Sequence, residues 1–309
     1  INNHRVQVRF SEPVDSLSFE KASFTIGDTL KLSSVNILVA SLSGSTPTLV
    51  DLVIETTLDS GAAYRVKAER MYDRVGNGID TANSSYVFVG VSIPDTLRAM
   101  VGVSGLTDSA RGIVLEKSFE LMFSKPVLHI PLMNGIILKD STRATVPTDL
   151  RWLNATDVQL TPAAPLKSKA WYQLRVVLDS VRDYSGNRWR DSTWAIRFQT
   201  LDLRTTGTID GLVVDEQRDK GRGPIYVTIS SIDLTPQREK VLRLEKPGRF
   251  TCEQLPEGKY TLRGFRDSDS SGTFSFGRPF PFVPSERFAV SSDTVKVRAR
   301  WGVEGVMLR

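Results

Sequence analysis

The strongest constraint on the fold of this chain is that residues 1–200 contain the same set of short motifs twice. Three pairs of segments correspond in order along the sequence: Phe10–Val14 with Phe123–Val127, the pair Leu58 and Tyr64 with Leu166 and Tyr172, and Asp73–Asn77 with Asp183–Asn187. The separation between partners is 113 residues at the first match and 110 at the last. Ordered matches at a nearly constant separation predict two copies of one structural unit.

Each repeated motif is typical of β-structure. Arg5–Phe10 alternates polar and apolar residues, which is the period of a half-buried strand, and Pro13 then interrupts ladder pairing. The Leu-x5-Tyr spacing, with alternating residues after Tyr64, is typical of the tyrosine corner of an Ig-type sandwich. The Asp-x-x-Gly-Asn motif is typical of a turn, because the Asp side chain caps the turn while Gly and Asn accept positive φ.

These motifs resemble those of a known domain. FSEPVD near the start, Leu-x5-Tyr in the middle and Asp-x-x-Gly-Asn near the end are similar to the bacterial Ig-like domain of S-layer proteins, the SbsA-type or Big_5 domain. The resemblance covers about residues 1–200, as two tandem copies. It implies a β-sandwich of exported bacterial proteins that serves as a spacer or scaffold, and it brings no catalytic residues.

The two copies differ at their beginnings. About 30 residues separate Ile93 from Phe123, which is enough for an opening strand such as Ala110–Val114, whereas nine residues precede Phe10. We therefore expect the first domain to lack its opening strand. Because unpaired strand edges attract other strands, we also expect upstream residues of the same protein or a neighbouring chain to cover that edge.

The pattern changes after Thr200, where a third unit begins. Candidate strands at Gly207–Val214 and Pro224–Ile229 precede a turn of the type Leu-Pro-x-Gly-x-Tyr at Leu255–Tyr260. This turn and its alternating strand resemble prealbumin-like or carboxypeptidase-regulatory-like domains and Cna-B-type surface modules. Those families imply a seven-stranded sandwich that acts as a stalk, an accessory domain or a carbohydrate-contacting unit.

The predicted fold class is thus all-β, with three consecutive Ig-like or prealbumin-like β-sandwiches over residues 1–92, 93–201 and 202–309. The arrangement resembles Ig-like exported proteins or lipoproteins of the Bacteroidota and their relatives, which implies a lipidated N-terminal Cys that this sequence does not show. Ile1–His4 contains neither an initiator Met nor the parts of a signal peptide. We therefore expect the chain to be a mature or truncated part of a longer product.

Composition excludes some partners. The formal net charge is +5, and the basic residues are spread along the chain, whereas nucleic-acid binding needs a concentrated basic face. No apolar run approaches the roughly 18 residues that span a membrane. Cys252 is the sole cysteine, so no internal disulfide forms, and it is predicted to be a small buried hydrophobe on a strand.

The third unit contains a candidate calcium site. Calcium loops place oxygen ligands at alternate positions of a tight turn that contains Gly, and Gly272 sits where that turn needs it. The candidate ligands are Asp267, Asp269, Ser271, Thr273 and Glu286. Arg278 occupies the position of the usual bidentate Glu, so Glu286 would have to fold back as its substitute. A calcium site and a polar hairpin turn remain alternative interpretations.

Aromatic residues provide the other candidate binding sites. Trp152 and Trp189 in the second domain are candidate ligand residues for sugar stacking, with strand packing as the alternative. Phe274, Phe276, Phe280 and Phe282 lie near the calcium candidate, where they could cover a domain edge or a partner surface. His129 is flanked by apolar residues and is predicted to be a satisfied structural histidine.

The sequence contains none of the catalytic or nucleotide-binding motifs G-x-S-x-G, G-x-G-x-x-G, P-loop or H-E-x-x-H. We therefore expect a non-catalytic scaffold or spacer at the extracellular or outer-membrane surface of a bacterium, with a periplasmic location as the other possibility. Its expected partners are other surface proteins or copies of itself. The alternative function is an adhesion module that binds a carbohydrate or a protein ligand.

Overall fold

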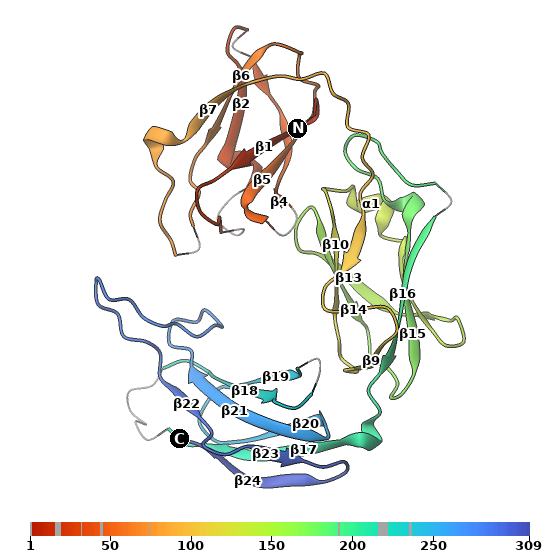
Figure 1. Cartoon of the computed structure of the whole chain (residues 1–309), viewed down its shortest axis with the longest axis vertical. Coiled ribbons are helices and arrows are strands. Elements are labelled where there is room, and N and C mark those ends of the chain that lie inside the picture. Colours follow the sequence, from red (N-terminus) through yellow and green to blue (C-terminus); the bar gives the residue numbers. More distant parts are fainter. Residues whose placement is uncertain are drawn as a thin grey trace. The chain divides into compact units, whose positions relative to one another are not determined.

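The computed structural model describes residues 2–15, 20–31, 33–43, 46–73, 75–190, 192–215, 222–234 and 237–309, and it is built mostly of β-strands (Figure 1). The chain divides into two compact units, residues 1–201 and 202–309. The first unit contains two pairs of sheets and the second contains one, and each pair encloses its own hydrophobic core. The prediction of an all-β chain of sandwich domains is therefore confirmed.

The first sandwich packs a three-stranded sheet against a four-stranded one. The strands of the smaller sheet, in spatial order, are β1 (Arg5–Arg9), β5 (Thr46–Ile54) and β4 (Ile37–Ser43). Those of the larger sheet are β3 (Ser34–Val35), β2 (Phe24–Asp28), β6 (Ala63–Ala68) and β7 (Ser85–Val89). Short 3-10 helices lie at η1 (Lys21–Ser23) and η2 (Thr81–Asn83). Alternate residues of β6 are buried, as period-2 patterning requires.

The second sandwich is larger by one strand in each sheet. One sheet has the spatial order β13 (Thr148–Trp152), β14 (Asp157–Pro162), β10 (Phe119–Phe123), β8 (Val101–Val103). The other has the order β12 (Thr145–Val146), β11 (Ile136–Asp140), β15 (Trp171–Val177), β16 (Thr193–Thr200), β9 (Ala110–Ile113). The short helices α1 (His129–Leu132) and η3 (Leu178–Ser180) connect strands, and η4 (Leu203–Thr205) opens the second unit.

The two sandwiches share one strand order. The order β1-β5-β4 corresponds to β10-β14-β13, and β3-β2-β6-β7 corresponds to β12-β11-β15-β16. The tyrosine corner that the Leu-x5-Tyr spacing predicted is present in both. The buried phenol oxygen of Tyr64 accepts a hydrogen bond from the Asp59 N–H at 2.9 Å, and that of Tyr172 accepts one from the Lys167 N–H at 2.9 Å.

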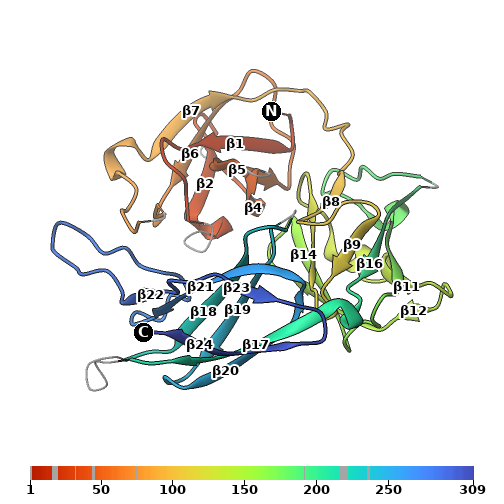
Figure 2. The same cartoon turned by 60° about the horizontal axis from the view of Figure 1, so that its bottom comes forward.

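The opening segment of the second sandwich has no counterpart in the described part of the first. β8 pairs antiparallel with β10, and β9 pairs parallel with β16, so this one segment joins both sheets (Figure 2). Among the described residues, β1 and β7 end their sheets without a strand on their outer sides. Among the described residues, the first sandwich therefore has no counterpart of β8 beside β1 and no counterpart of β9 beside β7.

The third sandwich forms the second compact unit. One sheet has the order β20 (Arg249–Pro256), β17 (Thr206–Val213), β24 (Gly302–Leu308). The other has the order β19 (Glu239–Leu244), β18 (Ile225–Ser231), β21 (Gly258–Arg266), β22 (Phe288–Val290), with β23 (Val295–Val297) also paired to β21. Cys252 lies in the core on β20, and burial raises the pKa of its thiol to about 11, which makes it a poor nucleophile. Its predicted role as a buried hydrophobe is confirmed.

Replacing Tyr172 with Phe removes the acceptor of the Lys167 N–H and leaves a backbone donor short of its partner. We expect the free energy of unfolding of the second sandwich to fall by about 1–3 kcal/mol. Denaturant titration followed by Trp fluorescence measures this loss, since four of the five Trp lie in that sandwich. The control is Arg151→Lys at an exposed position of β13 in the same sandwich, where a change below about 0.5 kcal/mol is expected. Equal losses in both variants would contradict the corner's role.

Candidate functional site

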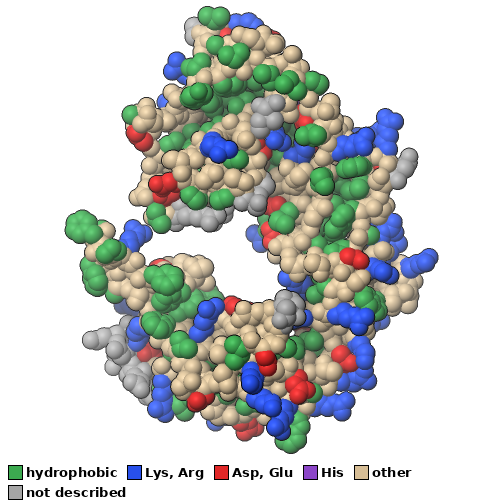
Figure 3. Space-filling view, viewed as in Figure 1, with side chains coloured by type: hydrophobic (Ala, Val, Ile, Leu, Met, Phe, Trp, Pro, Cys, Tyr) green, Lys and Arg blue, Asp and Glu red, His purple; other side chains and the backbone are tan. Residues whose placement is uncertain are grey.

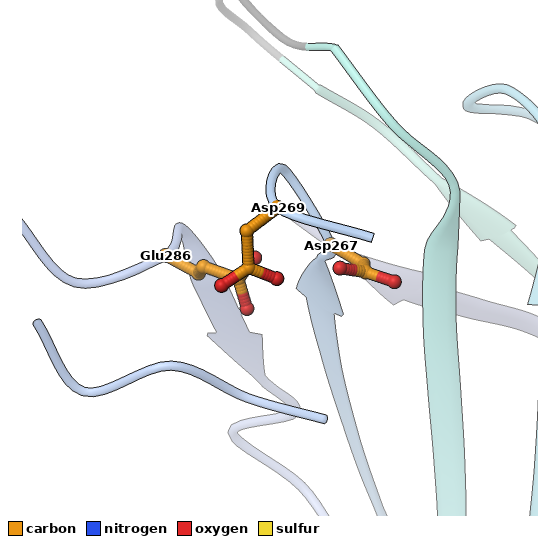
Figure 4. Close-up of side chains that lie close together, drawn as sticks. All are labelled: Asp267, Asp269 and Glu286. Carbon is orange, nitrogen blue, oxygen red and sulfur yellow. The ribbon is translucent and has the colours of Figure 1, made fainter. Parts of the chain in front are cut away.

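Three carboxylates converge at the base of the loop that links β21 to β22. Oxygens of Asp267, Asp269 and Glu286 lie within 4.8 Å of one another (Figure 4). Asp267 and Glu286 are buried, with 1% and 6% of their surface exposed, while Asp269 is exposed. The sequence places Glu286 nineteen positions after Asp267, so the loop has to return on itself to bring the two together.

Backbone amides of the loop hold the two buried carboxylates. Asp267 accepts one hydrogen bond from the Ser271 N–H and one from the Gly272 N–H, each at 3.0 Å. Glu286 accepts from the Ser268 N–H at 2.6 Å and from the Ser275 N–H at 3.0 Å. Because each buried oxygen has a donor, these carboxylates fix the loop even without a bound ion.

The third carboxylate remains ionised at neutral pH. A hydrogen bond from the Ser275 hydroxyl, together with bonds from Ser271, lowers the pKa of Asp269 to about 2. Carboxylates this close repel one another, and a divalent cation would offset that repulsion while using their free lone pairs. The cluster therefore has the oxygen chemistry that calcium prefers.

The other two candidate calcium ligands are engaged with each other. The Ser271 hydroxyl donates to the Thr273 carbonyl at 2.8 Å, and the Thr273 N–H donates back to the Ser271 hydroxyl at 3.3 Å. The structure thus brings together three of the five candidates as a carboxylate cluster, and calcium binding stays a prediction.

Trp152 and Trp189 are half-buried and contact other parts of the protein. The Trp152 ring stacks on the His129 ring, with 3.6 Å between ring centroids, and also lies against Phe123. The Trp189 indole N–H donates to the Ala99 carbonyl at 2.9 Å. These contacts account for both side chains through packing, and a role in ligand binding stays a prediction.

His129 packs against Trp152, but one of its ring nitrogens lacks the hydrogen-bond partner that we expected. Its Nε2 atom is buried without a hydrogen-bond partner among the described residues. Burial lowers the pKa of His129, since the charged ring would lose its hydration there. Stacking on Trp152, not hydrogen bonding at Nε2, holds this ring in place.

A buried ion-pair network, which the motifs did not reveal, ties the linker to the second sandwich. The Lys125 ammonium lies 2.5 Å from a carboxylate oxygen of Asp95 in the linker and 2.5 Å from one of Asp183 in the repeated turn. All three side chains are at most 6% exposed. Asn187 also donates to the Asp95 carbonyl at 2.9 Å. Burial alone would raise the pKa of Asp95, but the Lys125 ammonium, together with hydrogen bonds from Ser185 and the Leu97 N–H, holds that pKa below its usual value.

The loop beyond the carboxylates displays aromatic side chains to solvent. Phe276, Phe280 and Phe282 are 85%, 91% and 79% exposed, and hydrophobic side chains gather on this loop at the left of Figure 3. Phe274 packs inward against Phe265 on β21. Trp301 is also 70% exposed, and none of the sequence motifs pointed to it. Among the described residues, most of the exposed aromatic side chains therefore lie in the third sandwich.

One family profile matches the chain. Residues 100–200 match Big_5, described as a bacterial Ig-like domain, and this match covers the second sandwich. No curated protein matches the sequence. Among the described residues no helix is both long enough and apolar enough to cross a membrane.

Similar solved structures are distant. The N-terminal part of the bacterial S-layer protein SbsC is 13% identical with a TM-score of 0.28, over 64% of this chain and 42% of that one. An L,D-transpeptidase from Mycobacterium smegmatis is 13% identical with a TM-score of 0.30, over 69% and 90%. BcpA*(D312A), the major pilin subunit of Bacillus cereus, is 10% identical with a TM-score of 0.18, over 98% and 99%. Similarities this weak carry no argument about function.

The calcium prediction is tested by titration. Millimolar Ca²⁺ is expected to raise the melting temperature of the third sandwich, because the ion would offset repulsion among the three carboxylates, and chelator should reverse the shift. Asp269→Asn removes the exposed carboxylate and should abolish the shift. An unchanged melting curve in calcium and in chelator would leave only the hairpin interpretation.

Lys125→Met should leave two buried carboxylates without their cation. We expect the second sandwich to lose about 3–5 kcal/mol of unfolding free energy. Trypsin should also cut faster after Arg98, because the linker would no longer be held by Asp95. Lys167→Met, at an exposed position, is the control. Unchanged stability together with an unchanged cleavage rate would refute the anchoring role.

Proposed function

We propose that this chain is a non-catalytic scaffold or spacer segment of an exported bacterial protein, located at the cell surface. The observation that carries the proposal is the match of the second sandwich to the bacterial Ig-like domain. Such domains would act as rigid modules that hold other parts of a protein in place and catalyse no reaction.

A tandem arrangement of two such domains is part of the proposal. The first sandwich repeats the strand order of the second and has the same tyrosine corner. These shared features support a common family for both, although the profile itself matches only residues 100–200.

The linker anchor supports a spacer role. Asp95 lies between the two sandwiches in sequence and is fixed to the second by Lys125 and Asn187. A linker held by a buried ion pair has less conformational freedom than one in solvent, and a spacer depends on such restriction.

We propose that the third sandwich is a prealbumin-like accessory domain. Tyr260 is fully buried, and its hydroxyl donates to the Pro256 carbonyl at 2.7 Å, which pins the predicted Leu-Pro-x-Gly-x-Tyr turn. The Bacteroidota origin and a lipid anchor on the full protein belong to the same proposal and rest on the sequence resemblance.

Ligand binding is the alternative function. The exposed aromatic loop of the third sandwich favours it, because exposed Phe side chains are common at contact surfaces. A partner protein fits such a surface better than a glycan does, since the half-buried Trp152 and Trp189 provide no open platform.

A domain exchange separates the two functions. In the full protein on its native cells, residues 100–200 are replaced with an unrelated β-sandwich of equal length. Antibody labelling of intact cells then detects an epitope tag inserted in the third sandwich. A spacer role predicts that labelling and cell adhesion persist, because only length matters. A second variant, Phe276→Ser, Phe280→Ser and Phe282→Ser, tests ligand binding: loss of adhesion with normal labelling in this variant would favour binding by the exposed loop of the third sandwich. A tag that is labelled only in lysed cells would contradict the surface location.

A further inference from the structure

The outer end of the loop between β21 and β22 is an apolar hairpin. In the sequence between Asp269 and Glu286, Arg278 is the only charged residue. The backbones of Arg278 and Val283 exchange two hydrogen bonds at 2.9 Å and enclose the four-residue turn Pro279–Phe282, here called the tip. Figure 1 shows the loop extending beyond the strands of the third sandwich. The tip thus consists of two prolines and two phenylalanines, without a polar side chain.

The side chains of the tip are open to water. Phe280 is 91% exposed and Phe282 is 79% exposed, and both Pro279 and Pro281 are exposed as well. Hydrating this much apolar surface is unfavourable compared with burying it. Single exposed apolar residues are normal on a protein surface, whereas a run of four on a protruding turn indicates a contact that buries them.

The backbone of the hairpin is suited to an apolar surrounding. An unpaired N–H that enters an apolar phase costs free energy, because it loses its hydrogen bonds to water. Proline has no N–H, so Pro279, Pro281 and Pro284 bring no such donor. The N–H groups of Arg278 and Val283 are already paired with each other's carbonyls. Moving the tip out of water therefore leaves few backbone donors to be satisfied.

Contacts below the tip hold the hairpin away from the sheet. The Glu286 N–H donates to the Ser275 carbonyl at 3.0 Å, and the Ser275 N–H donates to the Glu286 carboxylate at 3.0 Å. The Phe274 ring packs edge-on against Phe276, with 4.8 Å between centroids, and against Phe288, at 5.7 Å. These contacts support the loop from its base, so the tip projects outward instead of folding onto its own sandwich.

A lipid surface fits these features better than a protein pocket does. Protein contact patches usually combine an apolar centre with a polar rim, whereas the tip is apolar on all sides. At a membrane interface, aromatic side chains are favoured near the headgroups, and an Arg can bury its apolar stem while its guanidinium stays in water. Arg278 is placed for this, since it directly precedes the tip and closes its base.

We propose that the Pro279–Phe282 tip inserts into the interfacial layer of a lipid bilayer, with Arg278 at the level of the headgroups. Phe280 and Phe282 enter the boundary between headgroups and acyl chains, about 5–10 Å deep, as apolar interfacial segments do. Binding is weak and reversible, because even a single acyl chain gives only marginal attachment. The inference rests on the ligand-binding alternative, for which it names lipid as the partner of the loop, and it does not depend on the spacer role.

The test is flotation of the full chain with phosphatidylcholine vesicles at millimolar lipid. We expect the chain to float with the vesicles. The variant Phe276→Ser, Phe280→Ser, Phe282→Ser should lower the partition coefficient at least about tenfold, because it removes three exposed apolar side chains from the contact.

The matched control removes three comparably exposed apolar side chains from the other compact unit. It carries Leu30→Ser, Met100→Ser and Ile130→Ser, at positions that are 85%, 67% and 83% exposed. This variant should float as the unchanged chain does.

A second measurement reports insertion directly and leaves two of the three phenylalanines in place. Phe280→Cys is labelled with an environment-sensitive dye, and the buried Cys252 does not compete for the label. Vesicles should shift the emission of this dye to the blue. The same dye at Ser141→Cys, an exposed position of the second sandwich, should show no shift.

Three outcomes overturn the proposal. They are no flotation of the unchanged chain together with no dye shift at residue 280, equal loss of flotation in the triple variant and its control, and unchanged flotation in the triple variant. If vesicles do not bind but the triple variant still loses cell adhesion, the partner of the loop is a protein and not a lipid. None of these results affects the spacer role, which the domain exchange tests separately.

Discussion

The pairing of main-chain groups at strand edges is the constraint on which these sandwiches depend. Every strand at the end of a sheet carries N–H and C=O groups that need partners, and an Ig-like sandwich has two such ends next to each other. The second sandwich satisfies both with one segment that changes from β8 to β9. The first sandwich has the same sheets and the same corner, yet its described residues end at β1 and β7. At these two positions the sandwiches differ, although their remaining strands follow one order.

The repeated turn has a different structural role in each copy. The reason is that the residue before Pro in the Phe-Ser-x-Pro-Val motif is acidic in the first copy and basic in the second. In both copies the turn Asp forms a bridge to the Val of the Phe-Ser-x-Pro-Val motif, Asp73 to Val14 and Asp183 to Val127. In the first copy the variable residue is the exposed Glu12, and Asp73 only caps its own turn. In the second it is Lys125, which is buried against Asp183. That cation then attracts Asp95, so a turn motif becomes the anchor of a linker.

Local patterns could be predicted from the sequence, and contacts between separate segments could not. The Leu-x5-Tyr spacing predicted both tyrosine corners, because that hydrogen bond spans only five residues. Asp95 lies outside the repeat and 30 residues before Lys125, so no spacing rule points to their ion pair. Trp189 follows a polar turn, and its local sequence leaves sugar stacking and packing as alternatives. Its indole N–H donates a hydrogen bond to the Ala99 carbonyl, 90 residues away in the sequence, and this contact accounts for its packing.

The third sandwich combines a fixed base with an exposed tip. Asp267 and Glu286 accept amide hydrogen bonds from the loop between them, which closes the base of the loop. The tip is a small hairpin, in which the Arg278 and Val283 backbones exchange hydrogen bonds at 2.9 Å. Exposed Phe280 and Phe282 lie on this hairpin, so two sets of backbone hydrogen bonds position them. Because these hydrogen bonds already restrict the backbone, ordering the tip further would cost less entropy than ordering an unrestrained loop.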